Sequence, residues 1–359
     1  MSENQYVVIM AGGVGSRFWP FSRESHPKQF HDFLGQGKTL IQQTVERFEG
    51  FCPKENIFIV TNEKYHDLIK MQVPFLEEHQ ILLEPFMRNT APCIAYASYK
   101  IYQKNSQANI VVAPADHIIT KQDEFIKSTQ IALEAASKNE IIVTLGIHPT
   151  RPDTGYGYIQ VNEKVMLGNI HKVKTFTEKP NLELAKAFLA SGDFVWNAGI
   201  FIFNVQTILK EFQEHLPDIH EAFYEICPHF YTEKEKKAIE RAYSLCRSIS
   251  IDYGVMEKSK NVYVLRADFG WSDLGTWKSL YEISDKDAHQ NVIQGNVLTY
   301  ETYNSIFKMP DEKLVVVQGL KNFIVAEYNN VLLICEKDQE QRIKDFVKDI
   351  REQKGDKYL

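Results

Sequence analysis

Near its start the sequence has a glycine-rich loop that directly follows an apolar run and precedes two cations. The loop and its flanks comprise Ala11, Gly12, Gly13, Gly15, Ser16, Arg17 and Lys28. Glycines have no Cβ and adopt positive φ readily, so several backbone N–H groups can surround one anion. Arg17 adds a planar fork that binds phosphate through two hydrogen bonds, and Lys28 adds a point charge. The stretch predicts a polyphosphate site, and the alternative is a tight turn beside two surface cations.

Two common phosphate motifs do not fit this loop. A dinucleotide fingerprint needs a third glycine where Phe18 stands, and a Walker loop needs Gly-Lys-Ser/Thr at a spacing that is absent. Arg17, two residues after the last glycine, is therefore the distinguishing residue of the loop.

Two aspartates are candidates for a metal site. Asp116 follows an apolar run, and Asp273 follows a Gly-Trp turn. Carboxylates from two separate loops suit Mg²⁺, which completes its octahedron with water and phosphate oxygens. The alternative for Asp273 is that it or Ser272 caps the next helix.

The elements that must position these residues follow an alternating pattern up to about residue 150. Short apolar runs near 7–10, 56–61, 80–85, 109–113 and 140–146 predict strands, and the segments between them have helical periodicity. This alternation is typical of a parallel sheet covered on both faces, whose sites lie on loops at the carboxyl ends of strands. We expect the glycine loop, the loop of Arg88, Asn89 and Thr90, and Asp116 to converge there. Asn89 and Thr90 can bind a purine base or cap the helix that follows them.

The pattern changes beyond residue 150. Segments 154–159 and 173–180 predict antiparallel or crossing strands, and 196–199 predicts a loop entering a buried strand. Segments 207–226 and 233–245 predict two helices. After 291 come five short apolar segments punctuated by Gly, Asn and Asp, which predict a small β-region that can stack as irregular coils. A charged helix is expected over about 339–353.

The composition narrows the class of protein. The chain has 359 residues, a net charge of −6 and five cysteines. The negative charge argues against a nucleic-acid or anionic-membrane partner, and no apolar run approaches the about 20 residues of a membrane span. Five dispersed cysteines without a CxxC pair indicate reduced, buried thiols, so we expect a cytoplasmic protein.

Several stretches resemble the sugar-1-phosphate nucleotidyltransferases, and within them the mannose-1-phosphate guanylyltransferases (GDP-mannose pyrophosphorylases). The matching stretches are Gly12–Pro20, Ser22–Arg23, Pro27–Phe30, Glu84–Pro92, Pro114–His117, Phe176–Pro180, Trp196–Gly199 and Gly270–Asp273. They keep the family's order over about residues 6–280.

The resemblance implies a fold and a division into domains. The expected fold is α/β, a Rossmann-like, GT-A-like three-layer nucleotidyltransferase fold with a mixed, mostly parallel sheet. A catalytic domain is expected over 1–285, with a nucleotide half over about 1–150 and a sugar-phosphate half over about 151–285. Residues 286–359 are expected to form a small β-rich domain, of short β-helix-like form, with a terminal helix. Many bacterial relatives continue into an isomerase domain that this chain is too short to hold, so we expect a single activity.

The resemblance also implies the role of each site residue. The expected reaction is transfer of GMP from GTP to mannose 1-phosphate by direct displacement. The implied catalytic residues are Arg17, Lys28, Asp116, Lys179 and Asp273. The implied nucleotide ligands are Ala11, Gly12, Gly13, Gly15, Ser16, Arg17, Lys28, Arg88, Asn89, Thr90 and Asp116. The implied sugar-phosphate ligands are Gly157, Glu178, Lys179, Asn197 and Asp252. Asp116 and Asp273 are the implied ligands of Mg²⁺.

Two alternatives stay open beside this prediction. The same chemistry with another nucleotide or sugar 1-phosphate fits the motifs, and so does a non-catalytic subunit that senses a sugar nucleotide. The presence of both aspartates together with Arg17, Lys28 and Lys179 favours the enzyme. The short β-segments after residue 291 are compatible with a homodimer.

Overall fold

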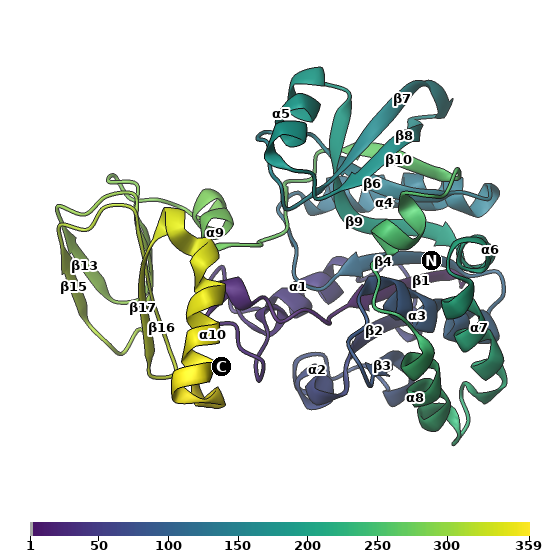
Figure 1. The fold of residues 1–359 in the computed structure, drawn as a ribbon, viewed down its shortest axis with the longest axis horizontal. Coiled ribbons are helices and arrows are strands. Elements are labelled where there is room, and N and C mark those ends of the chain that lie inside the picture. Colours follow the sequence, from purple (N-terminus) through teal and green to yellow (C-terminus); the bar gives the residue numbers. More distant parts are fainter. Residues whose placement is uncertain (1–2) are drawn as a thin grey trace. The chain divides into compact units, whose positions relative to one another are not determined.

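The computed structural model describes residues 3–359, which form two compact units (Figure 1). The larger unit contains the chain up to Gly12, Thr44–Ala115 and Ile119–Trp271. The smaller unit contains Gly13–Gln43, Asp116–Ile118 and Ser272–Leu359. The glycine loop therefore leaves the larger unit after Gly12 and continues in the smaller one.

A nine-stranded sheet forms the centre of the larger unit, in the order β3-β2-β1-β4-β9-β6-β10-β8-β7. Its strands are β1 (Gln5–Met10), β2 (Ile57–Asn62), β3 (Ile81–Glu84), β4 (Asn109–Pro114), β6 (Ile142–Ile147), β7 (Gly157–Leu167), β8 (Ile170–Glu178), β9 (Phe194–Asn204) and β10 (Val262–Ala267). The first four run parallel, with Val8 opposite both Phe58 and Val112. Because β9 runs antiparallel to β4 and β6, and β7 pairs antiparallel with β8, the sheet is mixed, as expected.

Helices cover both faces of this sheet. One face packs with α3 (Thr90–Lys104), α6 (Val205–His215), α7 (Pro217–Ile226) and α8 (Glu235–Leu245) in a single apolar core. The other face packs with α4 (Gln122–Lys138) against β4, β6, β9 and β10. Side chains alternate along each strand, so one strand supplies both cores. The remaining helices before residue 200 are α1 (Leu40–Arg47), α2 (His66–Gln72) and α5 (Leu182–Ser191).

Two details differ from the sequence predictions. The single helix expected over 207–226 is two helices, because Leu216 leaves helical geometry with φ −137° and Pro217 begins α7 at its N-terminus. The loop expected at Trp196–Gly199 lies inside β9, where the register with β6 shifts between Thr144 and Gly146. Asn197 is therefore held by a sheet and not by a loop.

The smaller unit is built on short parallel strands. These are β12 (Val292–Gln294), β13 (Val297–Tyr300), β14 (Ile306–Lys308), β15 (Val315–Gln318), β16 (Phe323–Tyr328) and β17 (Val331–Glu336). Ile306 of β14 lies opposite Val292 of β12 and Ile324 of β16, and β13 pairs in parallel with β15. The predicted stacking of short coils is confirmed, and of these six strands only β17 returns antiparallel, on β16.

Residues distant in sequence share the core of the smaller unit. Phe18 of the glycine loop lies 4.6 Å from Phe33 and 5.4 Å from Trp277, measured between ring centroids. Trp277 begins α9 (Trp277–Ile283), and Ile343 begins the terminal helix α10 (Ile343–Lys354), which packs on the short 3₁₀ turn η1 (Ser16–Phe18). The loop is thus supported by the C-terminal segment of the same unit.

Two predictions about composition also have an outcome. The five cysteines are free and buried, as expected. Among the described residues, no helix is both long and apolar enough to cross a membrane.

Candidate functional site

The glycine loop is shaped by one position that requires glycine. Gly15 has φ +74°, and a Cβ there would lie 2.6 Å from Cβ of Lys28. Its lack of a side chain lets η1 start beside Lys28, whose backbone N–H donates to the carbonyl of Val14 at 3.0 Å. The loop and the lysine are therefore folded onto each other.

Lys28 joins the two predicted metal-binding aspartates. Its side chain is almost fully buried, and Nζ donates to Oδ2 of Asp116 and to the backbone carbonyl of Asp273, each at 2.8 Å. Burial alone would raise the pKa of Asp116, but the Lys28 ammonium and then His117 hold that pKa below its usual value. Asp116 is therefore an anion at neutral pH, with its charge partly balanced by Lys28.

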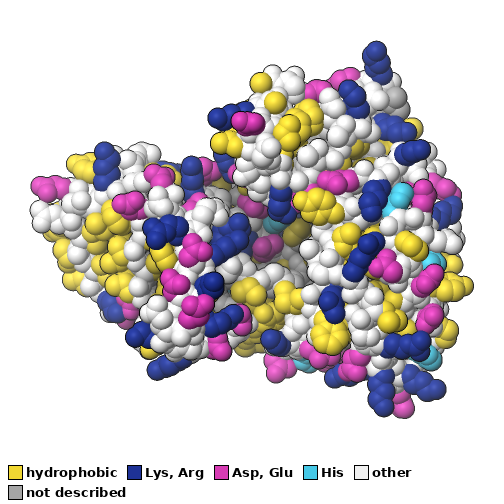
Figure 2. Space-filling model, in the orientation of Figure 1, with side chains coloured by type: hydrophobic (Ala, Val, Ile, Leu, Met, Phe, Trp, Pro, Cys, Tyr) yellow, Lys and Arg dark blue, Asp and Glu magenta, His cyan; other side chains and the backbone are white. Residues whose placement is uncertain are grey.

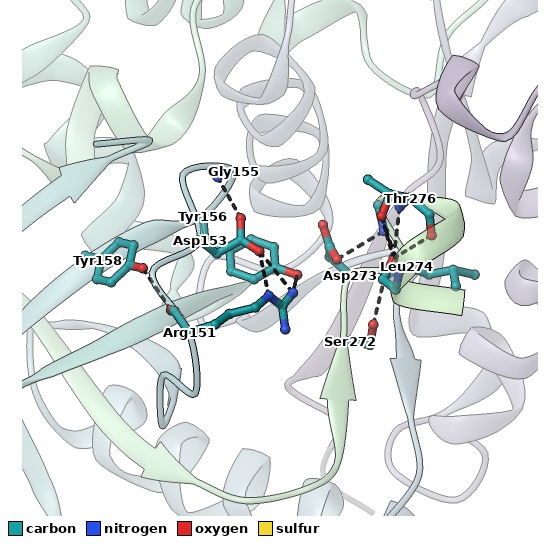
Figure 3. Close-up of polar contacts among 11 residues, drawn as sticks. Arg151, Asp153, Gly155, Tyr156, Tyr158, Ser272, Asp273, Leu274 and Thr276 are labelled. Carbon is teal, nitrogen blue, oxygen red and sulfur yellow. Dashed lines mark hydrogen bonds and ion pairs between the residues drawn. The ribbon is translucent and has the colours of Figure 1, made fainter. Parts of the chain in front are cut away.

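The turn that carries Asp273 is held by hydrogen bonds between its own backbone N–H groups and its own side chains (Figure 3). Gly275 N–H donates to Oδ1 of Asp273 at 3.1 Å, and Leu274 N–H donates to Oγ of Ser272 at 3.2 Å. The N-cap of α9 is Thr276, which exchanges hydrogen bonds with Ser279. The capping alternative for Ser272 and Asp273 is therefore wrong.

The donor set around Lys28 fits a hard divalent cation. The described residues contain no cluster of three or more His, Cys, Asp or Glu side chains that could hold a metal ion by themselves. Lys28 binds the Asp116 carboxylate and the backbone carbonyl of Asp273, so two aspartates are brought to one ammonium. Two aspartates match the sparse protein ligation of Mg²⁺, which takes its other ligands from phosphate and water. Asp116 and Asp273 are thus chemically suited to hold such an ion together with a nucleotide.

At the end of β1 the larger unit holds the remaining nucleotide candidates. The Ala11 carbonyl accepts a hydrogen bond from the Thr61 hydroxyl at 2.9 Å, and a Cβ on Gly12 would lie 3.6 Å from Oε2 of Glu84. Glu84 ends β3, is only 4% exposed and accepts from the Tyr243 hydroxyl at 2.9 Å. Burial raises the pKa of Glu84 to about 7. No role was predicted for Glu84 from the sequence. The sequence feature that could have indicated its burial is an acidic residue at the end of an apolar strand.

The Arg88–Thr90 loop leads from β3 into α3. Asn89 has φ +70° and caps α3 by accepting from Thr90 N–H at 2.8 Å. The Thr90 hydroxyl oxygen accepts from Ile251 N–H at 2.8 Å, so the loop is tied to the chain just before Asp252. Arg88 Nε is buried and has no hydrogen-bond partner among the described residues.

The predicted sugar-phosphate residues form one cluster in the larger unit. A Cβ on Gly157 would lie 2.5 Å from Oε2 of Glu178 and 3.3 Å from Cβ of Asn197. Lys179, at φ +48°, donates to Oε1 of Glu178 at 2.5 Å, and Asn197 donates to Oδ1 of Asp252 at 3.0 Å. All five residues predicted for this role are therefore close together.

The charged side chains of this cluster shift one another's pKa values. Burial, and then the negative charge of Glu178, raise the pKa of Asp252 to about 7. Burial opposes the charged form of Lys179, but the hydrogen bond and charge of Glu178 raise its pKa above the usual value. Lys179 is thus a cation at neutral pH, and further positive charge near Asp252 favours its ionised form.

A loop before β7 holds Gly157 in place, and its residues were not predicted (Figure 3). Arg151 donates to Oδ2 of Asp153 at 3.0 Å and to the Tyr156 hydroxyl at 3.2 Å. The Tyr156 ring lies edge-on to Trp196 and Trp271, at 5.0 and 5.2 Å between centroids. The alternation of glycine and tyrosine over 155–158 was the signal for this packed turn.

Each unit therefore gathers a different set of predicted residues. The smaller unit brings together Gly15, Lys28, Asp116 and Asp273. Arg17 belongs to the same unit, but its Nε donates to Oε1 of Gln341 at 2.9 Å. The larger unit holds the end of β1, the Arg88–Thr90 loop and the cluster around Gly157.

Comparison with known proteins places this architecture in a family. The nucleotidyl transferase model matches residues 6–290, and a MannoseP isomerase/GMP-like beta-helix domain model matches residues 295–350. The chain therefore belongs to the nucleotidyl transferase family, with an α/β catalytic fold and a C-terminal β-helix-like region.

Its relatives indicate which members of this family the chain is similar to. The chain is 34% identical to the mannose-1-phosphate guanylyltransferase of Escherichia coli, over 97% of this chain and 76% of that one. It is 37% identical to the alginate biosynthesis protein AlgA of Pseudomonas aeruginosa, over 96% and 71%. A solved structure from Thermus thermophilus, described as a mannose-1-phosphate geranyltransferase, matches with TM-score 0.86 and 32% identity over 97% of this chain and 99% of that one.

Proposed function

We propose that this protein transfers GMP from GTP to α-D-mannose 1-phosphate, giving GDP-mannose and pyrophosphate. The observation that carries the proposal is the buried Lys28 ammonium, bound to Asp116 and to the Asp273 carbonyl beside the glycine loop. The names of the relatives support the choice of nucleotide and sugar.

In this proposal the smaller unit binds the polyphosphate. Backbone N–H groups of Gly13, Gly15 and Ser16, with Arg17 and Lys28, stabilise the negative charge that develops on the departing pyrophosphate. Ala11 and Gly12 continue this backbone toward the nucleoside, and Arg88, Asn89 and Thr90 bind the base. The Thr90 hydroxyl oxygen accepts a hydrogen bond from Ile251 N–H, so its O–H can still donate a hydrogen bond to the base.

Asp116 and Asp273 are the proposed ligands of Mg²⁺. Bound there, the ion would neutralise charge on the nucleotide's phosphate oxygens and increase the electrophilicity of the α-phosphorus. Lys28 keeps the Asp116 carboxylate ionised and oriented for this role.

The cluster around Gly157 binds the second substrate. Lys179 pairs with the phosphate of mannose 1-phosphate, Glu178 and Asn197 form hydrogen bonds with sugar hydroxyls, and Asp252 supports Asn197. Gly157 lets the Glu178 carboxylate lie against the backbone, because a Cβ there would overlap Oε2 of Glu178, and we assign it to the same sugar site.

The reaction is then an in-line displacement. An anionic phosphate oxygen of mannose 1-phosphate attacks the α-phosphorus of GTP, the bond from this phosphorus to the bridging oxygen breaks, and pyrophosphate leaves with those electrons. The nucleophile is already ionised, so no base is required, and the chain's contribution is positioning and electrostatic stabilisation.

The test is release of pyrophosphate from GTP, Mg²⁺ and mannose 1-phosphate, with GDP-mannose identified by mass spectrometry. A matrix of four nucleoside triphosphates against mannose, glucose and fucose 1-phosphates defines the specificity. Turnover fastest with another pair would reassign the substrates, whereas binding of GDP-mannose without turnover of any pair would indicate a sensing subunit.

Two further proposals concern the domains and the location of the protein. We assign the catalytic domain to 1–285 and the C-terminal domain to 286–359, supported by the ranges of the two family models. We also propose that the protein is cytoplasmic, which its free, buried thiols support.

A homodimer through the C-terminal strands is supported by hydrophobic side chains gathered there (Figure 2). Leu298, Tyr300, Leu314 and Val316 lie on or directly before the paired strands β13 and β15, and Leu332 and Ile334 lie on β17, which belongs to the other sheet. Isolated exposed apolar residues are ordinary, but a patch on adjacent strands is typical of an interface. Light scattering of the purified chain should give twice the monomer mass, and a monomer at all concentrations would refute the dimer.

A further inference from the structure

The C-terminal segment of the smaller unit holds the glycine loop at several points. Trp19 Nε1 donates to the Tyr358 carbonyl at 2.8 Å, and Arg23 donates to the Tyr328 carbonyl at 2.8 Å. The helix α10 packs on η1, which has Arg17 at its centre. The loop's shape therefore depends on residues more than 300 positions away.

Arg17 itself is oriented by this segment. Its Nε donates to Oε1 of Gln341 at 2.9 Å, which fixes the plane of the guanidinium. Within residues 3–359, the two terminal nitrogens of that guanidinium make no hydrogen bond or ion pair. These are the nitrogens that bind a phosphate as a fork. The Arg17 guanidinium is thus oriented through Nε, while its two terminal nitrogens remain available to bind an anion.

A second cation accompanies Arg17. Lys344 lies one helical turn after Gln341, at the start of α10, and makes no hydrogen bond or ion pair within the described part of the chain. Repulsion from Arg17, and then burial, lower the pKa of Lys344. The nearby carboxylate of Glu340 accepts from Lys278 N–H at 2.8 Å, and the charge of Arg17 also acts on it. Within the described residues Glu340 forms no salt bridge with Arg17 or Lys344, so the two like charges lie near each other with only this longer-range compensation.

We propose that the start of α10 is part of the polyphosphate site, where Gln341 positions the Arg17 guanidinium and Lys344 contributes a further cation to the same phosphates. The inference rests on the proposed function only for the identity of the nucleotide, because its chemistry concerns the pyrophosphate group alone. Gln341 is a positioning residue, since it acts through Arg17.

The first experiment measures binding of inorganic pyrophosphate to the full chain by calorimetry, with Mg²⁺ present. Lys344→Gln should weaken binding about three- to tenfold, as expected for one partly exposed ion pair, and Lys344→Arg should restore most of it. Lys348→Gln is the matched control, because Lys348 lies one turn further along α10 and is 75% exposed beside Glu352. Equal affinity in Lys344→Gln and wild type, or no binding by wild type, would overturn the proposal.

The second experiment tests whether Gln341 acts through Arg17. Gln341→Leu removes the acceptor while keeping similar volume, so it should lower kcat/KM for GTP roughly tenfold and leave KM for mannose 1-phosphate unchanged. In an Arg17→Ala background the same change should have almost no further effect. A loss of equal size in both backgrounds, or a fall in Tm that accounts for the loss, would show a merely structural residue.

The two proposals fail separately. If the chain makes GDP-mannose but Lys344→Gln binds pyrophosphate like wild type, only this inference fails. If no nucleotide sugar is made, yet pyrophosphate binding has the expected dependence on Lys344, the assigned reaction fails and the polyphosphate site stands.

Discussion

Lys28 is the side chain on which the proposed chemistry depends most directly. Its ammonium is almost fully buried and holds Asp116 and the Asp273 carbonyl at 2.8 Å. Lys28→Ala would leave Asp116 without its partner and remove a charge that stabilises the leaving group. We expect kcat/KM for GTP to fall by roughly a hundredfold or more. Lys138→Ala, on the exposed face of α4, should behave as wild type, and full activity of Lys28→Ala would contradict the mechanism.

Glu84 makes stability depend on pH. Its pKa in the folded protein is raised to about 7 by burial, so the native state binds more protons than the unfolded chain between about pH 4.5 and 7. Stability should therefore fall as pH rises through this range. Glu84→Gln should be more stable than wild type by about 3 kcal/mol at pH 8 and similar to it at pH 4. Urea unfolding at both pH values measures this, and a difference that does not change with pH would refute it.

At the scale of elements, α9 links the Asp273 turn to the core. Thr276 caps this helix by accepting from Ser279 N–H at 3.2 Å. Thr276→Ala should lower the free energy of unfolding by about 1 kcal/mol, whereas Thr276→Ser should retain most of it. Thermal unfolding followed by circular dichroism checks this, and equal stability of the two variants would show that the cap contributes little.

Elements of high local periodicity were predictable from the sequence. Strands β1 and β4 and the two short ladders of the smaller unit follow apolar runs that any buried strand needs. The split at Leu216 was missed although Pro217, which begins α7, is a local signal for it. The placement of Asn197 in β9 was missed because it depends on pairing with neighbouring strands. Gln341 had no local signal at all, since its partner Arg17 is 324 positions away.

At the scale of the whole molecule, the chain is held without covalent cross-links. Burial raises the pKa of Cys52 and of Cys246 to about 12 and that of Cys227 to about 11, so the thiolate is scarce. A thiol reagent should react with almost none of the five free cysteines in the native protein and with all of them in denaturant. Reductant should leave Tm unchanged, and a shift of several degrees would reveal a disulfide.

The ties between the glycine loop and the end of the chain also set an order of events during synthesis. Trp19, Arg23 and Arg17 emerge from the ribosome more than 300 residues before their partners Tyr358, Tyr328 and Gln341. At a translation rate of about 5–20 residues per second, these partners are synthesised of the order of tens of seconds after the glycine loop. The glycine loop can therefore be fully assembled only after residue 358 has been synthesised, so a chain interrupted before that point would lack an ordered loop.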